Sequence, residues 1–252
     1  FFFVVQKHSR ARKYADAATG KVTLKELRQE IEAKRNKDLL MSYGLVPFEK
    51  DRERDMLERY QFIQQDLKES RQFGAQRRAS EGKAAEIALV NLSVRAGFAD
   101  VTRLKLRMES CMTKAYASYM DWKTVEDLEL RLHIGENGKS EIQCQKNGKV
   151  LKSLPSRVGK NPYVLEVKEA NKKLKDQYSR ARKMMEESME SGAEFLAGEI
   201  ASLWENPVVK AILQSLVFVS GKQTGMFVSE NGGYYLENYE KKKKKISEET
   251  SL

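Results

Sequence analysis

The spacing of apolar residues changes near residue 128 from a helical repeat to strict alternation, which restricts the chain to folds that combine helices with an antiparallel sheet. Apolar and polar residues alternate from Leu128 to Ile134. Two Asn-Gly pairs follow, Asn137-Gly138 and Asn147-Gly148. Such pairs favour the type I′ hairpin turn, which needs positive φ at both central residues. The pattern predicts a three-stranded antiparallel meander with one buried and one charged face.

Four amphipathic helical patterns precede this meander. They are expected over residues 23–44, from 51 toward 74, over 84–95, and from 100 or 102 to 119. Thr23 and Glu26 have the spacing of a capping box at the start of the first helix. In the third, Ile87, Val90 and Val94 are expected on the apolar side. Short loops between the four helices are typical of a bundle or a helical repeat.

The residues after the meander combine helical and strand signals. Asn161-Pro162 opens the longest expected helix, which ends at Gly192. A short helix over about 193–204 and another starting at Asn206-Pro207 follow. Residues 216–219 are typical of a buried strand, and the Asn-Gly-Gly of 231–233 indicates a final hairpin.

These patterns predict an α+β fold that is mainly helical, with a small antiparallel sheet packed against the long helix. We expect a helical region over residues 1–120 and an α+β region over 121–239, in which the meander and the later strands share one sheet. The five lysines that begin the segment 240–252 predict a disordered tail. The apolar start at Phe1 is interpreted as a cut end, with no secretory leader.

The chain carries a net charge of +10, with the basic surplus in its N-terminal half and in the lysine tail. Such a surplus can attract polyanions, although solvated helix faces also account for it. If the helices around residues 71–107 pack side by side, their basic residues converge. The expected polyanion-binding set is Arg71, Arg77, Arg78, Lys83, Arg103, Lys105 and Arg107.

Catalytic and metal chemistry find little support in the residue pattern. The sequence has two histidines, His8 and His133, and two isolated cysteines, Cys111 and Cys144. Neither pair has metal-ligand spacing, and the isolated cysteines are typical of a reducing compartment. Sequence motifs for nucleotide phosphate loops, zinc proteases and serine hydrolases are missing. We therefore expect no catalytic residue, metal or cofactor, unless an enzyme site is completed by residues outside this sequence.

Several segments resemble one bacterial family of unknown function. The segments are 73–81, 96–104, 148–155 and 205–209, and the resemblance runs from about Leu57 to Val219. The family comprises the MolR-like proteins, named for a proposed link to the regulation of molybdate metabolism, and some members carry a WGR domain associated with DNA binding. This sequence has no Trp-Gly-Arg triplet. The resemblance implies an internal region of a larger protein and supplies no catalytic residue.

The favoured expectation is a structural or protein-interaction region of a larger multidomain bacterial protein. Its partners would be the remainder of the parent protein and other proteins. Nucleic-acid binding through the basic N-terminal half is the alternative, and part of an enzyme is the second alternative. No stretch has the roughly 18 apolar residues that a membrane span requires, so we expect no membrane partner and a cytoplasmic location.

Overall fold

Helices form the first part of the chain, and helices with two antiparallel sheets form the second. The structure is a computed structural model that describes the backbone of residues 2–252 and the side chains of residues 9–252. It divides into unit 1, Phe1–Met108, and unit 2, Glu109–Leu252, which we describe separately. The division lies inside helix α6 (Val101–Lys114), whereas the sequence analysis placed it at residue 120. The predicted mainly helical α+β class is confirmed.

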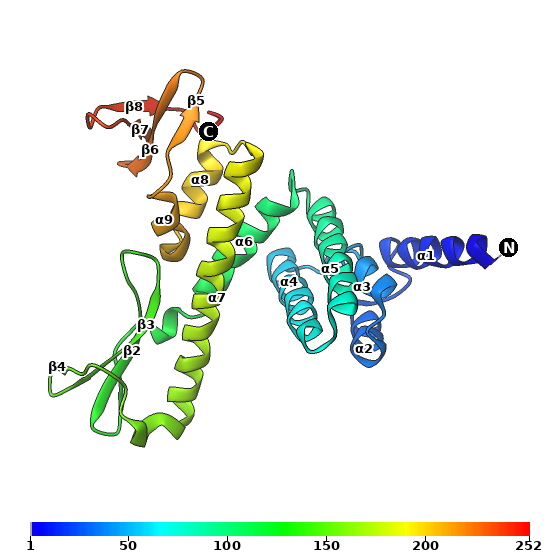
Figure 1. The fold of residues 1–252 in the computed structure, drawn as a ribbon, viewed down its shortest axis with the longest axis horizontal. Coiled ribbons are helices and arrows are strands. Elements are labelled where there is room, and N and C mark those ends of the chain that lie inside the picture. Colours follow the sequence, from blue (N-terminus) through cyan, green and yellow to red (C-terminus); the bar gives the residue numbers. More distant parts are fainter. Residues whose placement is uncertain (1) are drawn as a thin grey trace. The chain divides into compact units, whose positions relative to one another are not determined.

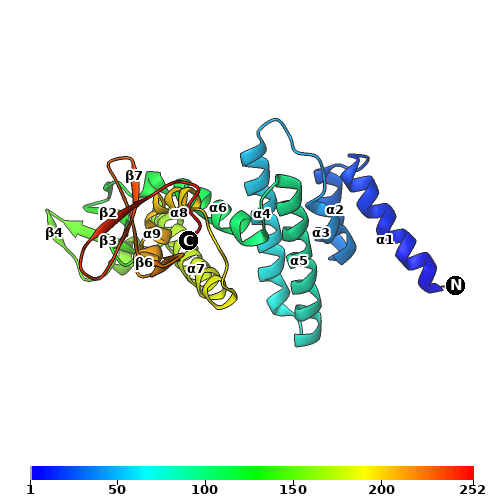
Figure 2. The same cartoon turned by 90° about the horizontal axis from the view of Figure 1, so that it is seen from above.

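Unit 1 is a set of packed helices (Figures 1 and 2). Its helices before α6 are α1 (Phe2–Ala18), α2 (Leu24–Lys34), α3 (Lys37–Tyr43), α4 (Arg52–Glu69) and α5 (Ala75–Ala96). The capping box predicted at Thr23 is present, with its hydroxyl accepting from the amide of Glu26. The single helix predicted over 23–44 is instead α2 and α3. Arg35 adopts a left-handed conformation (φ 47°) that ends α2, and Asn36 caps α3.

Helix α5 packs through a different stripe from the one predicted. Ile87, Val90 and Val94 are exposed by 41%, 42% and 71%, while Ala88 and Leu92 are fully buried. The reason is the close approach of α3: a Cβ on Gly44 would lie 2.5 Å from the carbonyl oxygen of Ala88. Only the alanine-rich face of α5 leaves room for such contact.

The buried Tyr43 gives unit 1 a specific sensitivity to high pH. Its ring packs 4.9 Å from that of Phe62, and burial raises the pKa of its phenol from 10.0 to about 12. Because the raised pKa belongs to the folded state, this contribution to stability is complete below pH 10 and is lost as pH rises through about 12. We therefore expect the unfolding free energy of unit 1 to fall more steeply over this window in wild type than in Tyr43→Phe, measured by chemical denaturation at successive pH values. Equal slopes would contradict the burial of this phenol.

Unit 2 is built around one long helix, α7 (Pro162–Ser191) (Figure 1). Its strands are β1 (Lys123–Val125), β2 (Leu128–Ile134), β3 (Ser140–Lys146), β4 (Lys149–Val150), β5 (Phe218–Ser220), β6 (Gln223–Glu230), β7 (Gly233–Glu237) and β8 (Lys243–Ile246). In the described part of the sequence, three α-helices lie between β4 and β5. They are α7 and the two short helices α8 (Ala197–Trp204) and α9 (Pro207–Leu213).

The strands form two sheets rather than the single shared sheet that was predicted. The orders are β1-β2-β3-β4 and β5-β6-β7-β8, all antiparallel, so the predicted meander gains β1 as a fourth strand. Asn147-Gly148 has positive φ at both residues, as the type I′ turn requires, but at the first pair only Gly138 does. The physical reason is the length of the loop. Residues 135–139 form a loop longer than the two-residue type I′ turn, and a hydrogen bond from the Gly135 amide to the Lys139 carbonyl closes it.

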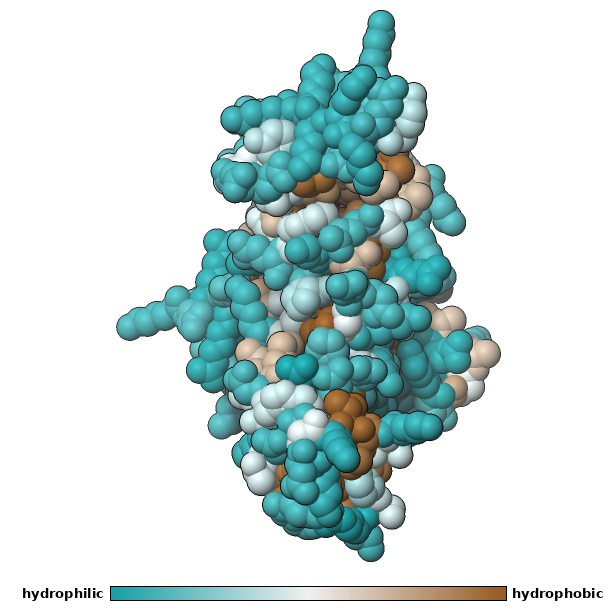
Figure 3. Space-filling view, turned by 90° about the vertical axis from the view of Figure 1, so that its left-hand side faces the viewer, coloured by the Kyte–Doolittle hydropathy of each residue, from teal (hydrophilic) through white to brown (hydrophobic). Residues whose placement is uncertain are grey.

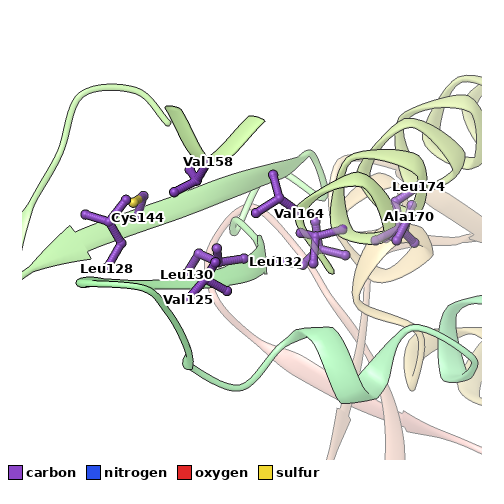
Figure 4. Close-up of a cluster of buried hydrophobic side chains, with 11 residues drawn as sticks. Val125, Leu128, Leu130, Leu132, Cys144, Val158, Val164, Ala170 and Leu174 are labelled. Carbon is purple, nitrogen blue, oxygen red and sulfur yellow. The ribbon is translucent and has the colours of Figure 1, made fainter. Parts of the chain in front are cut away.

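The core of unit 2 lies between the first sheet and α7. Figure 4 shows side chains of β2, β3 and α7 directed toward one another, among them Leu130, Leu132, Cys144 and Val164. Leu128, Leu130 and Leu132 are exposed by 1% or less, so the buried face predicted from alternation is confirmed.

The C-terminal residues differ from two further predictions. The tail predicted to be disordered contains β8, whose backbone pairs with β7 while Lys243 contacts Glu230 at 2.7 Å. The backbone ladder and these charge contacts order the lysine-rich segment. The stretch 216–219 is predicted as a buried strand, but only its last two residues lie in the edge strand β5; Phe218 is buried, whereas Val217 before the strand and Val219 in it are exposed.

The loop at Gly138 should tolerate no side chain. This residue has φ +74°, and a Cβ there would lie 2.8 Å from both the Val208 carbonyl oxygen and the Ala211 Cβ of α9. Positive φ and overpacking together predict that Gly138→Ala lowers the unfolding free energy of unit 2 by about 2 kcal/mol. Gly148 is the matched control, with the same φ and no atom within 4 Å. Denaturation followed by tryptophan fluorescence should show a larger loss for Gly138→Ala than for Gly148→Ala, and equal losses would contradict the packing of this loop on α9.

Candidate functional site

A groove of about 660 Å³ lies in unit 2 at the C-terminal end of α7. Its walls come from five places in the sequence. They are the last turns of α7 with Met185 and Met189, the segment 192–195, Ile200 of α8, the residues 216–221 around β5, and the pair Ser251 and Leu252. We call this the β5 groove. Figure 1 shows β5 and the C-terminus, two of the segments that line it.

Local features of the sequence build each wall. Gly192 takes a left-handed conformation (φ 62°) that stops α7 and turns the chain back. The next residues form a short antiparallel pairing with the C-terminal residues, in which Phe195 and Leu252 exchange two backbone hydrogen bonds of 2.8 and 2.9 Å. Leu252 is thereby held at 8% exposure. The groove wall is therefore fixed by backbone bonds and does not depend on loop side chains alone.

The β5 groove exposes large apolar side chains beside polar groups and is nearly uncharged. Met189, Val217 and Val219 are exposed by 63%, 64% and 58%. Glu194 is the one charged side chain among the described residues that line the groove, and its carboxylate accepts a 2.7 Å hydrogen bond from the Ser251 hydroxyl. An apolar surface with few charges favours binding of an apolar partner over chemical catalysis.

The predicted basic residues lie in unit 1, and most of them contact carboxylates. Arg77 bonds Glu81 at 2.8 Å, Lys105 contacts Glu86 at 3.0 Å and Arg107 contacts Glu53 at 2.8 Å. Arg103 pairs with Asp100. These contacts offset much of the positive charge that the sequence predicted on this surface. Among the described residues, the side chains of the predicted set without an ion-pair partner are Arg71, Arg78 and Lys83, all exposed.

A second recess, of about 530 Å³, lies beside Arg77 and was not foreseen from the sequence. It is lined by cations from the end of α2, the start of α3 and the start of α5, but Arg35 is bound on several sides by Glu81, Glu69 and Asp66. Charge in this recess is therefore largely balanced.

The titration behaviour of this carboxylate cluster follows from its contacts. Burial alone would raise the pKa of Glu81, but hydrogen bonds from Arg35 and Arg77 outweigh it and hold that pKa below its ordinary value. For Asp66 burial dominates and raises the pKa, although Arg35 lies 3.2 Å away. The cluster joins α2, α4 and α5, so its role in the structure is to connect helices.

The histidine and cysteines considered in the sequence do not assemble into a site. His133 is half-buried in β2, paired in register with Glu141 of β3. Cys144 is buried in the core of unit 2 and Cys111 lies on α6, and the two cysteines are not joined by a disulfide. Among the residues that the structure describes, no cluster of three or more His, Cys, Asp or Glu could hold a metal ion. In the same part of the chain, no helix has the length and apolarity needed to cross a membrane.

Comparisons with known proteins divide the chain in nearly the same way as the structure. Residues 5–108 match the model of a family of unknown function, DUF5724, and residues 148–252 match a domain of unknown function, DUF4132. Each match covers less than half of the chain, and neither supports the MolR-like resemblance. The first match ends with unit 1 and the second lies within unit 2, where it contains the β5 groove. Comparisons with curated proteins and with solved structures found no match.

Proposed function

We propose that this chain is a non-catalytic protein-interaction region that binds another polypeptide in the β5 groove. One observation carries the proposal: a groove of about 660 Å³ is lined by Met189, Val217 and Val219, three exposed apolar side chains from two separate places in the sequence. Single exposed apolar residues are ordinary on protein surfaces, as in the small separate hydrophobic areas of the face shown in Figure 3. A contiguous apolar groove is typical of a binding site.

We further propose that the chain is an internal region of a larger multidomain bacterial protein of the MolR-like kind. The support is the set of sequence segments given above, one of which, 205–209, begins α9 beside the Gly138 loop. This wider assignment does not enter the argument for the groove.

Selection of peptides from a random phage-displayed library on the immobilised chain tests the proposed interaction. We expect enriched peptides rich in apolar residues, with at least tenfold weaker binding to Met189→Glu and Val219→Glu, because a carboxylate placed in an apolar interface loses its hydration without a partner. Val150→Glu is the matched control, since Val150 is 73% exposed on β4 outside the groove.

Two results would contradict this function. The first is a selection that enriches no peptide. The second is a set of peptides whose affinity falls equally in Val219→Glu and Val150→Glu, which would locate binding away from the groove.

Polyanion binding by unit 1 is our second candidate function. Its support is the three exposed cations without ion-pair partners among the described residues, Arg71, Arg78 and Lys83. If they bind nucleic acid, fluorescence anisotropy should show affinity for DNA or RNA that falls steeply between about 50 and 200 mM salt. Alanine at these three positions should weaken binding. The control is alanine at three exposed lysines of unit 2, Lys172, Lys175 and Lys244, which removes the same amount of charge and should weaken binding less. Equal losses, or no binding at 50 mM salt, would contradict this candidate.

A further inference from the structure

We propose that the partner in the β5 groove binds as an added β-strand: an extended peptide with apolar side chains pairs with the open edge of β5. The inference rests on the proposed function and specifies the conformation of the partner.

The position of β5 in its sheet leaves one side of its backbone without a strand. In the order β5-β6-β7-β8, β6 is the one strand that pairs with β5 among the residues that the structure describes. The outward amides and carbonyls of an edge strand form a template for another strand. Six consecutive residues, 216–221, line the groove. Three of them, Phe218, Val219 and Ser220, form β5. Because alternate side chains of a strand point to opposite faces, the presence of all three in the lining means that the groove runs along the backbone edge of β5.

The edge of β5 differs in charge from the other sheet edges of unit 2. β8 carries Lys243, Lys244 and Lys245, and the edge strands of the first sheet, β1 and β4, carry Lys123 and Lys149. Edge lysines discourage pairing with a further strand, since pairing would bring the charge against a second chain. β5 has the sequence Phe-Val-Ser and no charge. It is therefore the one edge among these four described strands without such protection.

The opposite wall of the groove supplies apolar contacts for the side chains of such a strand. Met185 and Met189 reach the groove from α7, and methionine side chains adapt to differently shaped partners. β5 itself is three residues long, Phe218–Ser220, and spans roughly 10 Å at about 3.3 Å per residue, which suits pairing with a peptide segment of about three residues. Glu194 on this wall disfavours acidic residues in the peptide. The expected ligand is a short, extended, apolar peptide without acidic side chains.

Backbone N-methylation of a peptide selected on the full chain tests the pairing, because a methyl group removes one donor and leaves the side chains unchanged. We expect alternation along the peptide: methylation at every second residue should weaken binding at least tenfold, and methylation at the residues between should change it less than twofold. The affinities are measured by fluorescence anisotropy, with a peptide of scrambled sequence as control. This design leaves the protein unaltered, so loss of binding cannot come from misfolding.

The outcomes separate this inference from the proposed function. Peptides that bind the groove but tolerate N-methylation everywhere, or that lose affinity equally at every position, would overturn strand addition and leave the interaction function standing. Absence of any groove-dependent peptide would overturn both. A third outcome is that the chain dimerises with increasing concentration, and that Val219→Glu abolishes the dimer while Val150→Glu does not. The occupant of the groove would then be a second copy of this chain, which would overturn the peptide as the stated partner.

Discussion

Replacing Arg59 by methionine should lower the unfolding free energy of unit 1 by about 3–5 kcal/mol. The Arg59 side chain is fully buried and donates two 2.6 Å hydrogen bonds to the Asp55 carboxylate. It also donates to the carbonyl oxygens of Val46 and Pro47, at 2.6 and 2.9 Å, and lies over the ring of Phe48. Methionine fills much of the volume of arginine, but it leaves the buried Asp55 carboxylate without its counter-charge. An unpaired buried charge is the main cost of breaking a buried ion pair.

Amide hydrogen exchange of peptides from unit 1, measured across a denaturant series, checks this expectation. The double variant Asp55→Leu/Arg59→Met is the control, because removing both charges avoids the orphaned carboxylate and should restore most of the lost stability. The surface pair Arg54 and Glu58 gives a second comparison, since its side chains are exposed and Arg54→Met should therefore cost far less stability than Arg59→Met. Equal losses in Arg54→Met and Arg59→Met would show that the buried pair does not support the fold.

Asn206→Ala should lower the unfolding free energy of unit 2 by about 2–4 kcal/mol, the second-largest effect expected. The side-chain oxygen of Asn206 caps α9 by accepting from the amides of Val208 and Val209. Its NH₂ group donates to the Thr113 hydroxyl at 2.8 Å and to the Ser110 carbonyl at 3.3 Å, both on α6. Alanine removes the cap and leaves buried polar groups of α6 short of a donor.

Asn161 provides the matched control, because it also precedes a proline and caps its helix, α7, through two amides. For Asn161 no bond from its NH₂ group to a second helix is present among the described residues, so Asn161→Ala should cost only about 1 kcal/mol. Both tryptophans, Trp122 and Trp204, lie in unit 2, so tryptophan fluorescence isolates its denaturation. Equal losses in the two variants would mean that the contacts of Asn206 with α6 contribute nothing.

The local elements were accessible from the sequence because their signals are local. The capping box at Thr23, the left-handed stop at Gly192 and the Asn-Pro start of α7 each depend on residues a few positions apart. The buried face of β2 followed from alternation alone. The local sequence says less about function and about the expected polyanion-binding residues, because both depend on which side chains meet in the folded chain. Arg77 and Lys105 each meet a carboxylate that periodicity does not reveal.

Packing between elements explains what the sequence missed. Helix α5 has two apolar stripes, and the contact with Gly44, directly after α3, decides that the alanine stripe is buried and Val94 is exposed. The β5 groove joins residues 185–195, 216–221 and 251–252, which have no common motif. One available signal was the uncharged β5 segment, set against lysines in β8. It acquires meaning only once both are known to be edges of the same sheet.

Amide hydrogen exchange of the full chain with and without a selected peptide tests most directly whether the β5 groove is the interaction site. We expect slower exchange at residues 216–221 when the peptide is bound, and unchanged exchange over β2 and β3 in the first sheet. Strand pairing would protect the outward amides of β5 because they gain hydrogen-bond partners. Protection confined to other parts of the chain, with 216–221 unchanged, would contradict the account.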